Sequence, residues 1–249
     1  MRDGKIVAIK GLGGFHLACD ATNADAVVRL RQKKERSNKP FAVMAADVEC
    51  AKEICEINKV EQDLLTGSIR PIVLLQRKTE TKIAHEVFCG LSEIGVMLPY
   101  TPVQHILMHD FCKAGGKFLV MTSGNIYDNP IIIDDDEAID VLGDIADAIL
   151  GNNRQIVARY DDSVVRVIKA GDDHAIQTIR RARGYCPEPL NVILGTGQND
   201  IIFATGPQQK NTFAFARPIV GAKSDDKANT EVFVSPHIGD MENARVFDA

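Results

Sequence analysis

A cluster of cationic side chains follows the first stretch of helical sequence. Lys34, Arg36 and Lys39 alternate with polar residues just before an apolar segment at 41–45. Arginine binds phosphate through two parallel N–H bonds and lysine adds a compact charge, so these residues could converge on one phosphate-rich ligand. They could equally be solvated cations at the end of a helix, where they complement its dipole.

A glycine-rich turn comes earlier in the chain, directly after a strand-like segment. It contains Lys10, Gly13, Gly14, Phe15 and His16. Glycines let backbone N–H groups approach an anion closely. The turn is not a dinucleotide fingerprint, because His16 stands where the third glycine would be, and the lysine of a P-loop is missing from its place. A plain tight turn is the alternative interpretation.

Small polar residues end another apolar segment, at Thr122, Ser123 and Asn125. Open α/β sheets place ligand contacts at the carboxyl ends of their strands, which makes these residues candidates for binding. A simple Asx or Ser turn explains the same residues equally well.

Carboxylates and arginines occur together between residues 159 and 183. One group contains Arg159, Asp161, Asp162 and Ser163, and another contains Arg180, Arg181 and Arg183. Mg²⁺ prefers carboxylates together with phosphate oxygens, so Asp161 and Asp162 could hold Mg²⁺ beside a phosphate. The two aspartates could instead cap a turn before the strand that starts at Ser163.

Histidine and cysteine spacing indicates no metal site. His105 and His109 have the i,i+4 spacing of helical metal ligands, but no carboxylate lies between them and no third ligand is evident. We interpret both as structural or surface residues. The 6 cysteines include no C-x-x-C pair. That pattern is typical of reduced thiols in the cytoplasm rather than of a zinc site or a disulfide framework.

Composition sets the general class. A chain of 249 residues with 45% hydrophobic and 25% charged residues is typical of a soluble globular protein with one large or two modest domains. The net charge of -5 argues against a general polyanion binder, so the basic clusters indicate a local anion site. No apolar run reaches the length of about 18 residues that a membrane span needs, and the N-terminus does not resemble a signal peptide.

Strand-like and helix-like segments alternate over the first 190 residues. The expected strands are 5–10, 41–45, 71–75, 93–98, 117–121, 148–150, 163–168 and 175–179. The expected helices are 23–34, 48–57, a segment that starts at Pro102, and 137–142. Several connections are too short for parallel crossovers. The pattern therefore predicts an α/β fold with a mixed, twisted sheet and flanking helices.

Helical spacing predicts which residues face the core. In the first helix they are Ala24, Val27, Val28 and Arg31, and after Pro102 they are Val103, Ile106, Leu107 and Phe111.

The character of the chain changes near Pro187 and Pro189, which are typical of a domain exit. Beyond them lie strand-like pieces at 201–204, 212–216 and 232–234, and the start of a helix at 242–249. We expect one domain over residues 1–190 and the opening of a second over 191–249, a length that is marginal for an independent fold.

Taken in order, the motifs resemble those of the HypF family. They are GLGGFHLACDA, K-x-R-x-x-K-P-F-A-V-M, GVMLPYTPVQHIL, MTSGN-x-x-x-x-P-I, RYDDSVVR and RRARGY-x-P-x-P. The resemblance implies a YrdC/Sua5-like domain over 1–190. The later segments QKNTF and SPHIGDMEN resemble the start of a Kae1-like, actin/ASKHA-type α/β domain. Threonylcarbamoyl-adenylate synthases of the Sua5/YrdC type are the nearest alternative, but they show P-T-x-T-x-Y-G-L where this chain has KGLGGFHL.

The resemblance implies a chemistry as well. HypF-like proteins use ATP, with Mg²⁺, to make carbamoyl adenylate from carbamate that derives from carbamoyl phosphate. They then transfer the carbamoyl group to the C-terminal cysteine of a HypE-like acceptor protein during hydrogenase maturation. The full-length family also binds zinc, for which we expect no site in this sequence. The acylphosphatase segment and the zinc clusters of the family are not in the sequence either, so we expect this chain to perform part of the reaction.

The resemblance also suggests roles for the candidate residues. Lys34 and Arg36 would grip the phosphates and the carboxylate end of carbamate, and Lys10 and His16 would contact the carbamoyl group. No general base is needed, because carbamate is already an anion. The remaining nucleotide-binding candidates are Gly13, Gly14, Phe15, Lys39, Thr122, Ser123, Asn125, Arg159, Ser163, Arg181 and Arg183.

Two alternatives stay open at this stage. YrdC-type domains resemble modules that bind double-stranded RNA, and the basic cluster from Arg29 to Lys39 could serve that purpose. The acidic total and the lack of interleaved aromatic residues in that cluster argue against RNA. The chain could also be a fragment that binds nucleotide but is catalytically inert.

Overall fold

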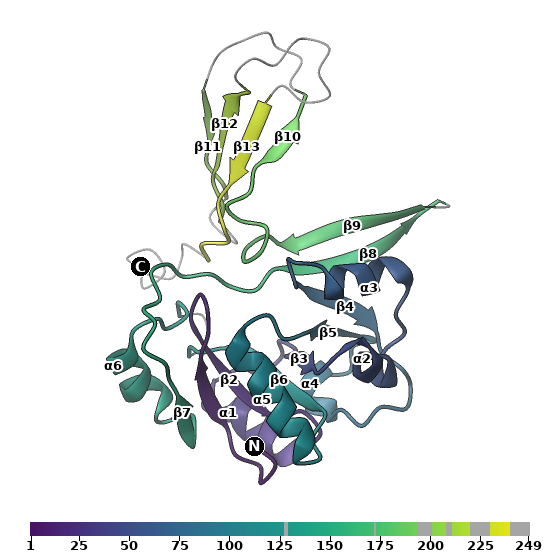
Figure 1. Ribbon diagram of the computed structural model, residues 1–249, viewed down its shortest axis with the longest axis vertical. Coiled ribbons are helices and arrows are strands. Elements are labelled where there is room, and N and C mark those ends of the chain that lie inside the picture. The colour runs from purple at the N-terminus through teal and green to yellow at the C-terminus, as the bar shows by residue number, and fades with distance from the viewer. Residues whose placement is uncertain (127–128, 172, 194–200, 208–210, 220–229, 240–249) are drawn as a thin grey trace.

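Two β-sheets organise the chain (Figure 1). The computed structural model describes residues 1–126, 129–171, 173–193, 201–207, 211–219 and 230–239. The larger sheet has 9 strands in the order β7-β1-β2-β6-β3-β5-β4-β8-β9, and the smaller has 4 strands in the order β10-β13-β12-β11. Parallel pairs such as β3 with β5 stand beside antiparallel pairs such as β2 with β6, so the large sheet is mixed.

The strands are short and mostly apolar. Those of the large sheet are β1 (Val7–Lys10), β2 (Phe15–Asp20), β3 (Ala42–Ala45), β4 (Ile72–Gln76), β5 (Glu93–Met97), β6 (Phe118–Ser123), β7 (Ala148–Leu150), β8 (Val164–Ala170) and β9 (Asp173–Arg180). Those of the small sheet are β10 (Leu190–Val192), β11 (Ile202–Ala204), β12 (Ala214–Pro218) and β13 (Thr230–Val234). Every residue of β2 is buried, which puts this strand in the middle of the fold.

The chain forms short helices, most of which begin at a polar cap residue. They are α1 (Ala24–Lys33), α2 (Val48–Ile54), α3 (Lys59–Thr66), α4 (His85–Phe88), α5 (Pro102–Lys113), α6 (Asp135–Glu137) and the π-helical turn η1 (Ala138–Leu142). The side chain of Asn23 accepts a hydrogen bond from the backbone N–H of Ala26 and so satisfies one free donor at the start of α1. Thr101 and Gln104 form a capping box at α5, with Pro102 in the first turn.

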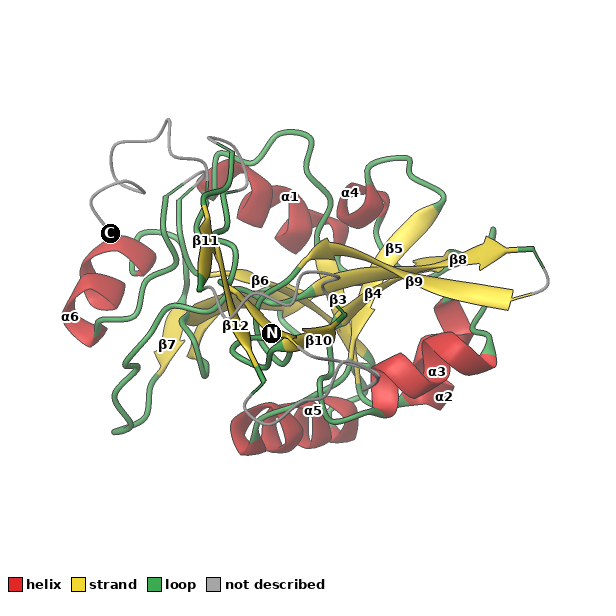
Figure 2. Cartoon of the chain, turned by 90° about the horizontal axis from the view of Figure 1, so that it is seen from above, coloured by secondary structure: helices red, strands yellow, loops and turns green. Residues whose placement is uncertain are grey.

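Apolar side chains pack on both faces of the large sheet. Seen from above, α1 and α4 lie on one face of the sheet and α5 on the other (Figure 2). Val27 and Leu30 of α1 belong to one core with Phe15 and Val120. Met108 of α5 belongs to a second core on the opposite face. Because alternate residues of a strand point to opposite faces, β2 and β6 contribute to both cores.

The predicted mixed α/β fold is confirmed, and several local predictions are corrected. Ala24 is exposed, and the buried face of α1 consists of Ala26, Val27 and Leu30. In α5, Ile106 is 63% exposed, whereas Met108 is buried. The helix predicted over 48–57 ends at Ile54, and α3 follows as a separate helix that the sequence pattern missed.

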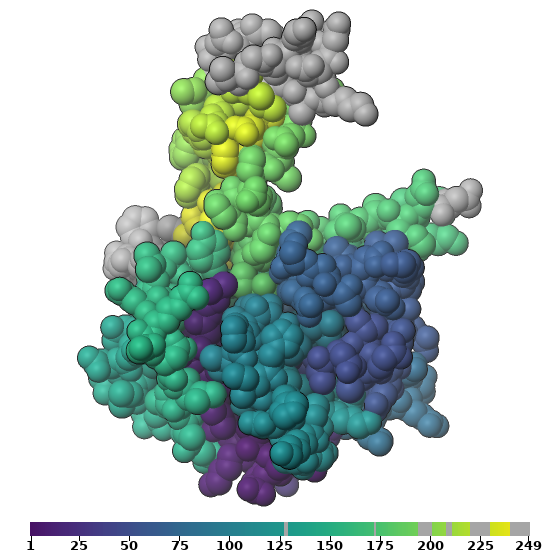
Figure 3. Space-filling view, viewed as in Figure 1, coloured from purple at the N-terminus to yellow at the C-terminus, as the bar shows by residue number. Residues whose placement is uncertain are grey.

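The β8–β9 hairpin and the small sheet both project from the main body (Figure 3). The small sheet is antiparallel throughout, and the strands predicted at 201–204, 212–216 and 232–234 correspond to β11, β12 and β13. The helix predicted at 242–249 lies outside the described residues. The Kae1-like character of residues 191–249 stays a prediction. Within the described residues, no helix combines the length and the apolar character that crossing a membrane requires.

Candidate functional site

The side chain of Lys34 ends among three oxygen atoms at the carboxyl end of β6. Its Nζ lies 2.6 Å from the carbonyl oxygen of Ser123, 2.6 Å from that of Asn125, and 2.7 Å from Asn125 Oδ1. Lys34 caps the C-terminus of α1, and only 1% of the residue is exposed. An ammonium group has three N–H donors, which match these three acceptors. One buried cation therefore joins the end of α1 to the end of β6.

Burial makes the charge on Lys34 costly. Desolvation is the main cause that lowers the pKa of Lys34 to about 7; the charges of Arg36 and Lys39 act in the same direction, and the carboxylate of Asp161 acts against them. An opposite charge placed beside a buried amine favours its protonated form. An anion that enters beside Lys34 would therefore be bound and would restore the proton.

The turn after β6 needs a glycine because another segment touches it. The backbone N–H of Gly124 donates to the carbonyl oxygen of Phe15 at 2.6 Å, and a Cβ at position 124 would lie 2.8 Å from the Cβ of Phe15. Ser123 Oγ donates to Asn125 Oδ1 at 2.8 Å. The turn thus presents a hydroxyl and an amide beside the ammonium group of Lys34.

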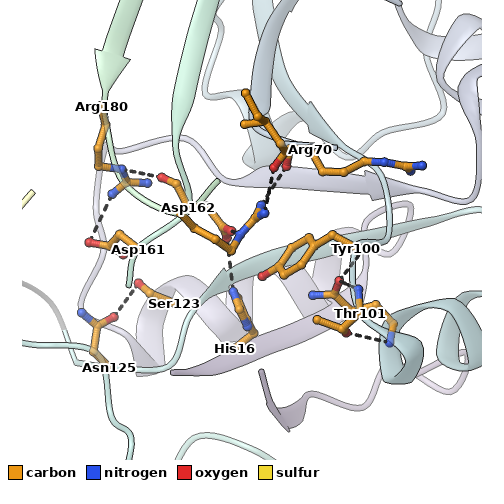
Figure 4. A network of polar contacts seen from close by, with 12 residues as sticks. His16, Arg70, Tyr100, Thr101, Ser123, Asn125, Asp161, Asp162 and Arg180 are labelled. Carbon is orange, nitrogen blue, oxygen red and sulfur yellow. Dashed lines mark hydrogen bonds and ion pairs between the residues drawn. The ribbon is translucent and has the colours of Figure 1, made fainter. Parts of the chain in front are cut away.

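A second polar network connects β2 to the segment before β8 (Figure 4). Nε2 of His16 lies 3.2 Å from Oδ2 of Asp162, and Nε of Arg183 donates to Oδ1 of the same carboxylate at 2.8 Å. Arg183 also donates to the carbonyl oxygens of Ile69 and Arg70, at 3.0 and 2.8 Å. His16 stands opposite Ser123 in the β2–β6 register, so this network adjoins the Lys34 cluster.

The carboxylate of Asp162 is held in its charged form. Burial would raise the pKa of Asp162, but the hydrogen bond to His16 and the charges of His16 and Arg183 hold it well below its usual range. The guanidinium of Arg183 also lies over the ring of Tyr100, 3.4 Å from its centroid. Burial, followed by the negative charge of Asp162, raises the pKa of the Tyr100 phenol, so the phenol stays neutral. The network is therefore a rigid, buried arrangement of fixed charges.

The glycine turn contacts the chain segment that carries Asp161 and Asp162. The carbonyl oxygen of Gly13 accepts the backbone N–H of Tyr160 at 3.0 Å. A Cβ at position 13 would lie 2.6 Å from the Cβ of Tyr160 and 2.8 Å from its backbone nitrogen. Backbone contact at this distance leaves no room for a side chain. Gly13 therefore positions Asp161 and Asp162, which come directly after Tyr160.

Gly13→Ala should destabilise the protein, because the new methyl group must push the segment at Tyr160 away. Overpacking of this kind costs about 1–3 kcal/mol, and urea unfolding would measure the loss. Gly151→Ala is the matched control, because an added Cβ at Gly151 meets no heavy atom within 4 Å. Equal stability losses in the two variants would contradict the proposed close packing at Gly13.

Comparison with known proteins places this chain in a family. The Sua5/YciO/YrdC family model, described as telomere recombination, matches residues 1–195. The chain belongs to the Sua5/YciO/YrdC family. Within that family it is similar to carbamoyltransferases. It is 43% identical over its whole length to carbamoyltransferase HypF2 of Cupriavidus necator and, over 98% of its length, 40% identical to HypF of Rhizobium leguminosarum bv. viciae.

Solved structures agree with the sequence relatives. A full-length HypF crystallised in a phosphate- and nucleotide-bound form is 42% identical to this chain, with a TM-score of 0.84 over 99% of the chain and 36% of that protein. HypF of T. kodakarensis is 36% identical, with a TM-score of 0.85 over 99% of this chain and 30% of that one. The chain spans 30% of the length of the curated HypF relatives. The HypF resemblance expected from the sequence motifs is confirmed.

In this Sua5/YciO/YrdC-family chain, Lys10 lies apart from His16. β1 and β2 are antiparallel, Lys10 stands opposite Phe15, and Ile9 stands opposite His16, so Lys10 and His16 point to opposite faces of the sheet. Nζ of Lys10 binds Asp135 at 2.7 Å and the carbonyl oxygen of Asn152 at 3.2 Å. The structure thus does not bring Lys10 and His16 to one substrate group, contrary to the roles suggested from the sequence. Lys10 instead ties β1 to the segment that leads to Asp161.

Several other predicted contacts already have protein partners. Ser163 is fully buried, and its hydroxyl donates to the carbonyl oxygen of Arg183 and accepts the N–H of Ala182. Arg181 donates to the carbonyl oxygens of Tyr185, Glu188 and Val234. Ser163 and Arg181 thus hold neighbouring segments of the chain together, and their role as nucleotide contacts stays a prediction.

Arg36 and Arg159 have backbone partners in the loops around the site. Arg36 donates to the carbonyl oxygens of Lys39 and Pro40, and its guanidinium lies 5.0 Å from the centroid of the Phe41 ring. Arg159 donates to the carbonyl oxygen of Ile131. Arg36 and Lys39 still act on the site, because both charges lower the pKa of Lys34. Thr122 is buried and stands opposite Leu17, on the other face of β6 from Ser123.

The two aspartates do not fit the predicted Mg²⁺ contact as a pair. Both oxygens of Asp162 are taken, by His16 and by Arg183. One oxygen of Asp161 lies 3.6 Å from Arg180 and 3.9 Å from His237. Among the described residues, no group of three or more histidine, cysteine, aspartate or glutamate side chains could hold a metal. His105 and His109 are exposed, in agreement with their interpretation as surface residues.

Two residues of the site were not singled out from the sequence: Tyr100 packs against Arg183, and His237 approaches Asp161. Arg180, a member of the predicted arginine group, donates to the carbonyl oxygen of Asp162. Tyr100 and His237 lie inside motifs that carried the family resemblance, GVMLPYTPVQHIL and SPHIGDMEN. Their membership of those motifs was the one available signal, because no spacing rule connects them to Asp161 or Asp162.

Proposed function

We propose that this chain forms carbamoyl adenylate from ATP and carbamate, the adenylation step of a HypF-type carbamoyltransferase. One observation carries the proposal: a buried lysine, Lys34, meets a Ser–Gly–Asn turn in a chain that is about 40% identical to HypF carbamoyltransferases over its whole length. The HypF structure in a phosphate- and nucleotide-bound form supports a nucleotide as the ligand.

The reaction needs charge stabilisation more than proton transfer. An oxygen of carbamate attacks the α-phosphorus of ATP, the bond from this phosphorus to the bridging oxygen breaks, and pyrophosphate leaves. Carbamate is already an anion, so no general base is required. The ammonium group of Lys34 would stabilise the negative charge that develops on the phosphoryl oxygens. Ser123 and Asn125 would orient the phosphate or the ribose beside it.

The second network would form the other wall of the site. Asp162 fixes His16 through Nε2, and Nδ1 of His16 is buried without a hydrogen-bond partner among the described residues. We assign His16 to the carbamoyl end of the ligand, and Arg183 to holding Asp162 rather than to binding nucleotide. The proposed site omits Lys10, Ser163 and Arg181. Mg²⁺ bound to ATP would neutralise part of the phosphate charge, but no step is assigned to a protein-bound metal.

The product would serve a transferase reaction. The thiolate of a cysteine attacks the carbamoyl carbon of the adenylate, AMP leaves, and an S-carbamoyl cysteine forms. The HypF relatives suggest that carbamoyl phosphate is the source of carbamate and that a HypE-like protein carries the acceptor cysteine at its C-terminus. Both belong to the proposal, since the chain spans 30% of the relatives' length.

The direct test is mass spectrometry of the product. The protein is incubated with ATP, Mg²⁺ and ammonium bicarbonate, which contains carbamate at equilibrium, and the mixture is searched for carbamoyl adenylate. A parallel sample with threonine and bicarbonate tests for threonylcarbamoyl adenylate. This alternative is included because the chain is 26% identical, over 60% of its length, to a threonylcarbamoyl-AMP synthase of Vibrio campbellii. Absence of carbamoyl adenylate, with or without the threonine product, would refute the proposed activity.

Duplex RNA is a weaker candidate ligand. Arg29 binds Asp147, Arg31 donates to the carbonyl oxygens of Arg36 and Lys39, and Lys33 donates to the carbonyl oxygen of Asp144. The net charge of -5 also argues against a general polyanion binder. We therefore do not propose RNA binding.

Nucleotide binding should take up protons above neutral pH. Lys34 has a pKa of about 7 in the free protein, so at pH 8 it is mostly neutral, and a bound phosphate raises its pKa and draws a proton from the buffer. ATP affinity should consequently fall as the pH rises above 7. Calorimetric titrations at pH 8, in two buffers with different ionisation enthalpies, would measure this uptake. Lys34→Met should abolish it, and unchanged uptake in that variant would contradict the assignment.

A further inference from the structure

The side chain of Arg31 binds the backbone of the loop that lies between α1 and β3. This basic loop (residues 35–40) carries Arg36 and Lys39. Nη1 of Arg31 donates to the carbonyl oxygen of Arg36 at 3.0 Å, and Nη2 donates to that of Lys39 at 3.1 Å. Nε donates to the carbonyl oxygen of Glu86 in α4 at 2.6 Å. One planar guanidinium group therefore fixes both ends of the loop to α4, because its donors point in set directions.

An aromatic ring supports the same guanidinium group. Phe41 is 1% exposed, and its ring centroid lies 4.5 Å from Cζ of Arg31 and 5.0 Å from Cζ of Arg36. At such distances a cation is attracted to the face of an aromatic ring. The backbone N–H of Phe41 donates to the carbonyl oxygen of Val87 at 2.9 Å, which ties this residue to α4 as well. Both arginines are thus anchored on one buried ring at the end of the basic loop.

The backbone of Arg31 closes the turn that contains Lys34. The N–H of Arg36 donates to the carbonyl oxygen of Arg31 at 3.0 Å, and the N–H of Glu35 donates to that of Gln32 at 3.1 Å. These two bonds form the Schellman motif that ends many helices. Glu35 has the left-handed conformation of that motif, with a φ of 54°, which a residue other than glycine keeps only where its surroundings enforce it. Arg31 joins the two sides of the turn through its backbone and through its side chain.

The closed turn determines where the ammonium group of Lys34 lies. Nζ of Lys34 is 2.6 Å from the carbonyl oxygen of Ser123 and 2.6 Å from that of Asn125. Since this group stands at the far end of a four-carbon side chain, its place depends on where the turn holds the backbone of Lys34. Contacts with Arg31 at one end of the residue and with β6 at the other therefore fix the cation.

We propose that Arg31 is a positioning residue for binding the phosphates of a nucleotide. It closes the turn around Lys34 and sets the backbone of the basic loop before the nucleotide arrives, so less ordering is left for the binding step. The inference rests on the proposed function, because it assumes that a nucleotide phosphate binds at Lys34. It adds that binding requires the planar donor geometry of Arg31 rather than its charge.

Replacing Arg31 by lysine separates geometry from charge. Arg31→Lys keeps the positive charge but loses the planar set of donors, so the dissociation constant of ATP, measured by calorimetry, should rise about tenfold, equivalent to about 1.4 kcal/mol. Arg31→Met, which also removes the charge, should show the same loss. Arg29→Lys is the matched control, since Arg29 lies in the same helix but binds Asp147 and the carbonyl oxygen of Gly4. It should bind ATP like the wild type.

A double-mutant cycle shows whether Arg31 acts through Lys34. In the Lys34→Met background, Arg31→Lys should change the affinity for ATP by no more than about twofold, because no ammonium group is left to position. A general loss of stability would not depend on Lys34 in this way. Thermal unfolding would identify any variant that is not folded, and Arg31→Gln replaces Arg31→Lys in the cycle if the lysine variant does not fold.

Three results would overturn the inference. They are wild-type affinity in Arg31→Lys, a loss in Arg31→Met that Arg31→Lys does not share, and the full tenfold loss in the Lys34→Met background. The second result would mean that the charge of Arg31 acts on the ligand, and the third that Arg31 acts independently of Lys34. A wild-type protein that does not bind ATP at all would instead reject the proposed function.

Discussion

Replacing Lys34 by alanine will lower carbamate-dependent ATP–pyrophosphate exchange by at least about a hundredfold, the cost of removing one preorganised charge or donor at a reacting phosphate. Lys34 is buried and its ammonium group is held by oxygens of Ser123 and Asn125, so its charge has a fixed place beside the Ser–Gly–Asn turn. The exchange of radiolabelled pyrophosphate into ATP measures the effect. The binding of ATP should weaken in the same variant, because the ground-state phosphate loses its cation.

The controls separate this loss from damage to the fold. Lys33→Ala removes an exposed cation one residue away and should keep exchange within about twofold of the wild type, since surface charges have little effect. Lys34→Met keeps the side-chain volume but leaves the oxygens of Ser123 and Asn125 without this donor, so it should lose about 1–3 kcal/mol of stability, which urea unfolding would measure. A Lys34→Met variant that is stably folded and retains exchange would remove Lys34 from the mechanism.

Part of this site was predictable because it depends on where secondary structure ends. Lys34 follows an amphipathic helix with a clear N-cap, and Ser123 ends an apolar strand, so both positions could be read from local patterns. That the segments of Lys34 and Ser123 meet was a hypothesis at the level of the sequence. In the structure, Lys34 donates hydrogen bonds to the carbonyl oxygens of Ser123 and Asn125, so the two segments lie together. The glycine turn adjoins the same place through the contact between Gly124 and Phe15.

The second network was not predictable from patterns. His16 and Asp162 are 146 positions apart in sequence, and their contact follows from the strand order of the sheet and the path of the chain between β7 and β8. Neither is encoded in local periodicity. The prediction that Lys10 and His16 contact the same group went wrong for a related reason. The β1–β2 register decides which face of the sheet a side chain points to, and a shift of one residue reverses it.

The helix predictions failed where tertiary packing overrode the spacing. Ile106 and Met108 are both apolar residues of α5, and the orientation of the helix on the sheet buries the methionine and exposes the isoleucine. α3 was missed because it is mostly polar, and Leu65 is its one buried residue. Its capping box of Asn58 and Glu61 was the local signal that could have revealed it.

Replacing Asp162 by alanine should cost about 3–5 kcal/mol of unfolding free energy, the usual effect of removing one partner from a buried ion pair. The variant leaves the guanidinium of Arg183 without its carboxylate and leaves His16 with no partner at Nε2. Arg183 cannot move into water easily, because it is held by carbonyl oxygens of Ile69 and Arg70. Urea unfolding at pH 7 would measure the loss, and Asp3→Ala, at an exposed aspartate, is the control.

The pH dependence gives an independent check on the same carboxylate. The pKa of Asp162 is lowered on folding, so the unfolded chain binds its proton first as the pH falls. The contribution of Asp162 is therefore complete above the ordinary aspartate pKa of about 4 and is lost progressively below it. Between pH 5 and 3, the stability of the wild type should fall more steeply than that of Asp162→Ala. Parallel curves would mean that Asp162 keeps an ordinary pKa, and the network would then contribute packing but no fixed charge beside His16.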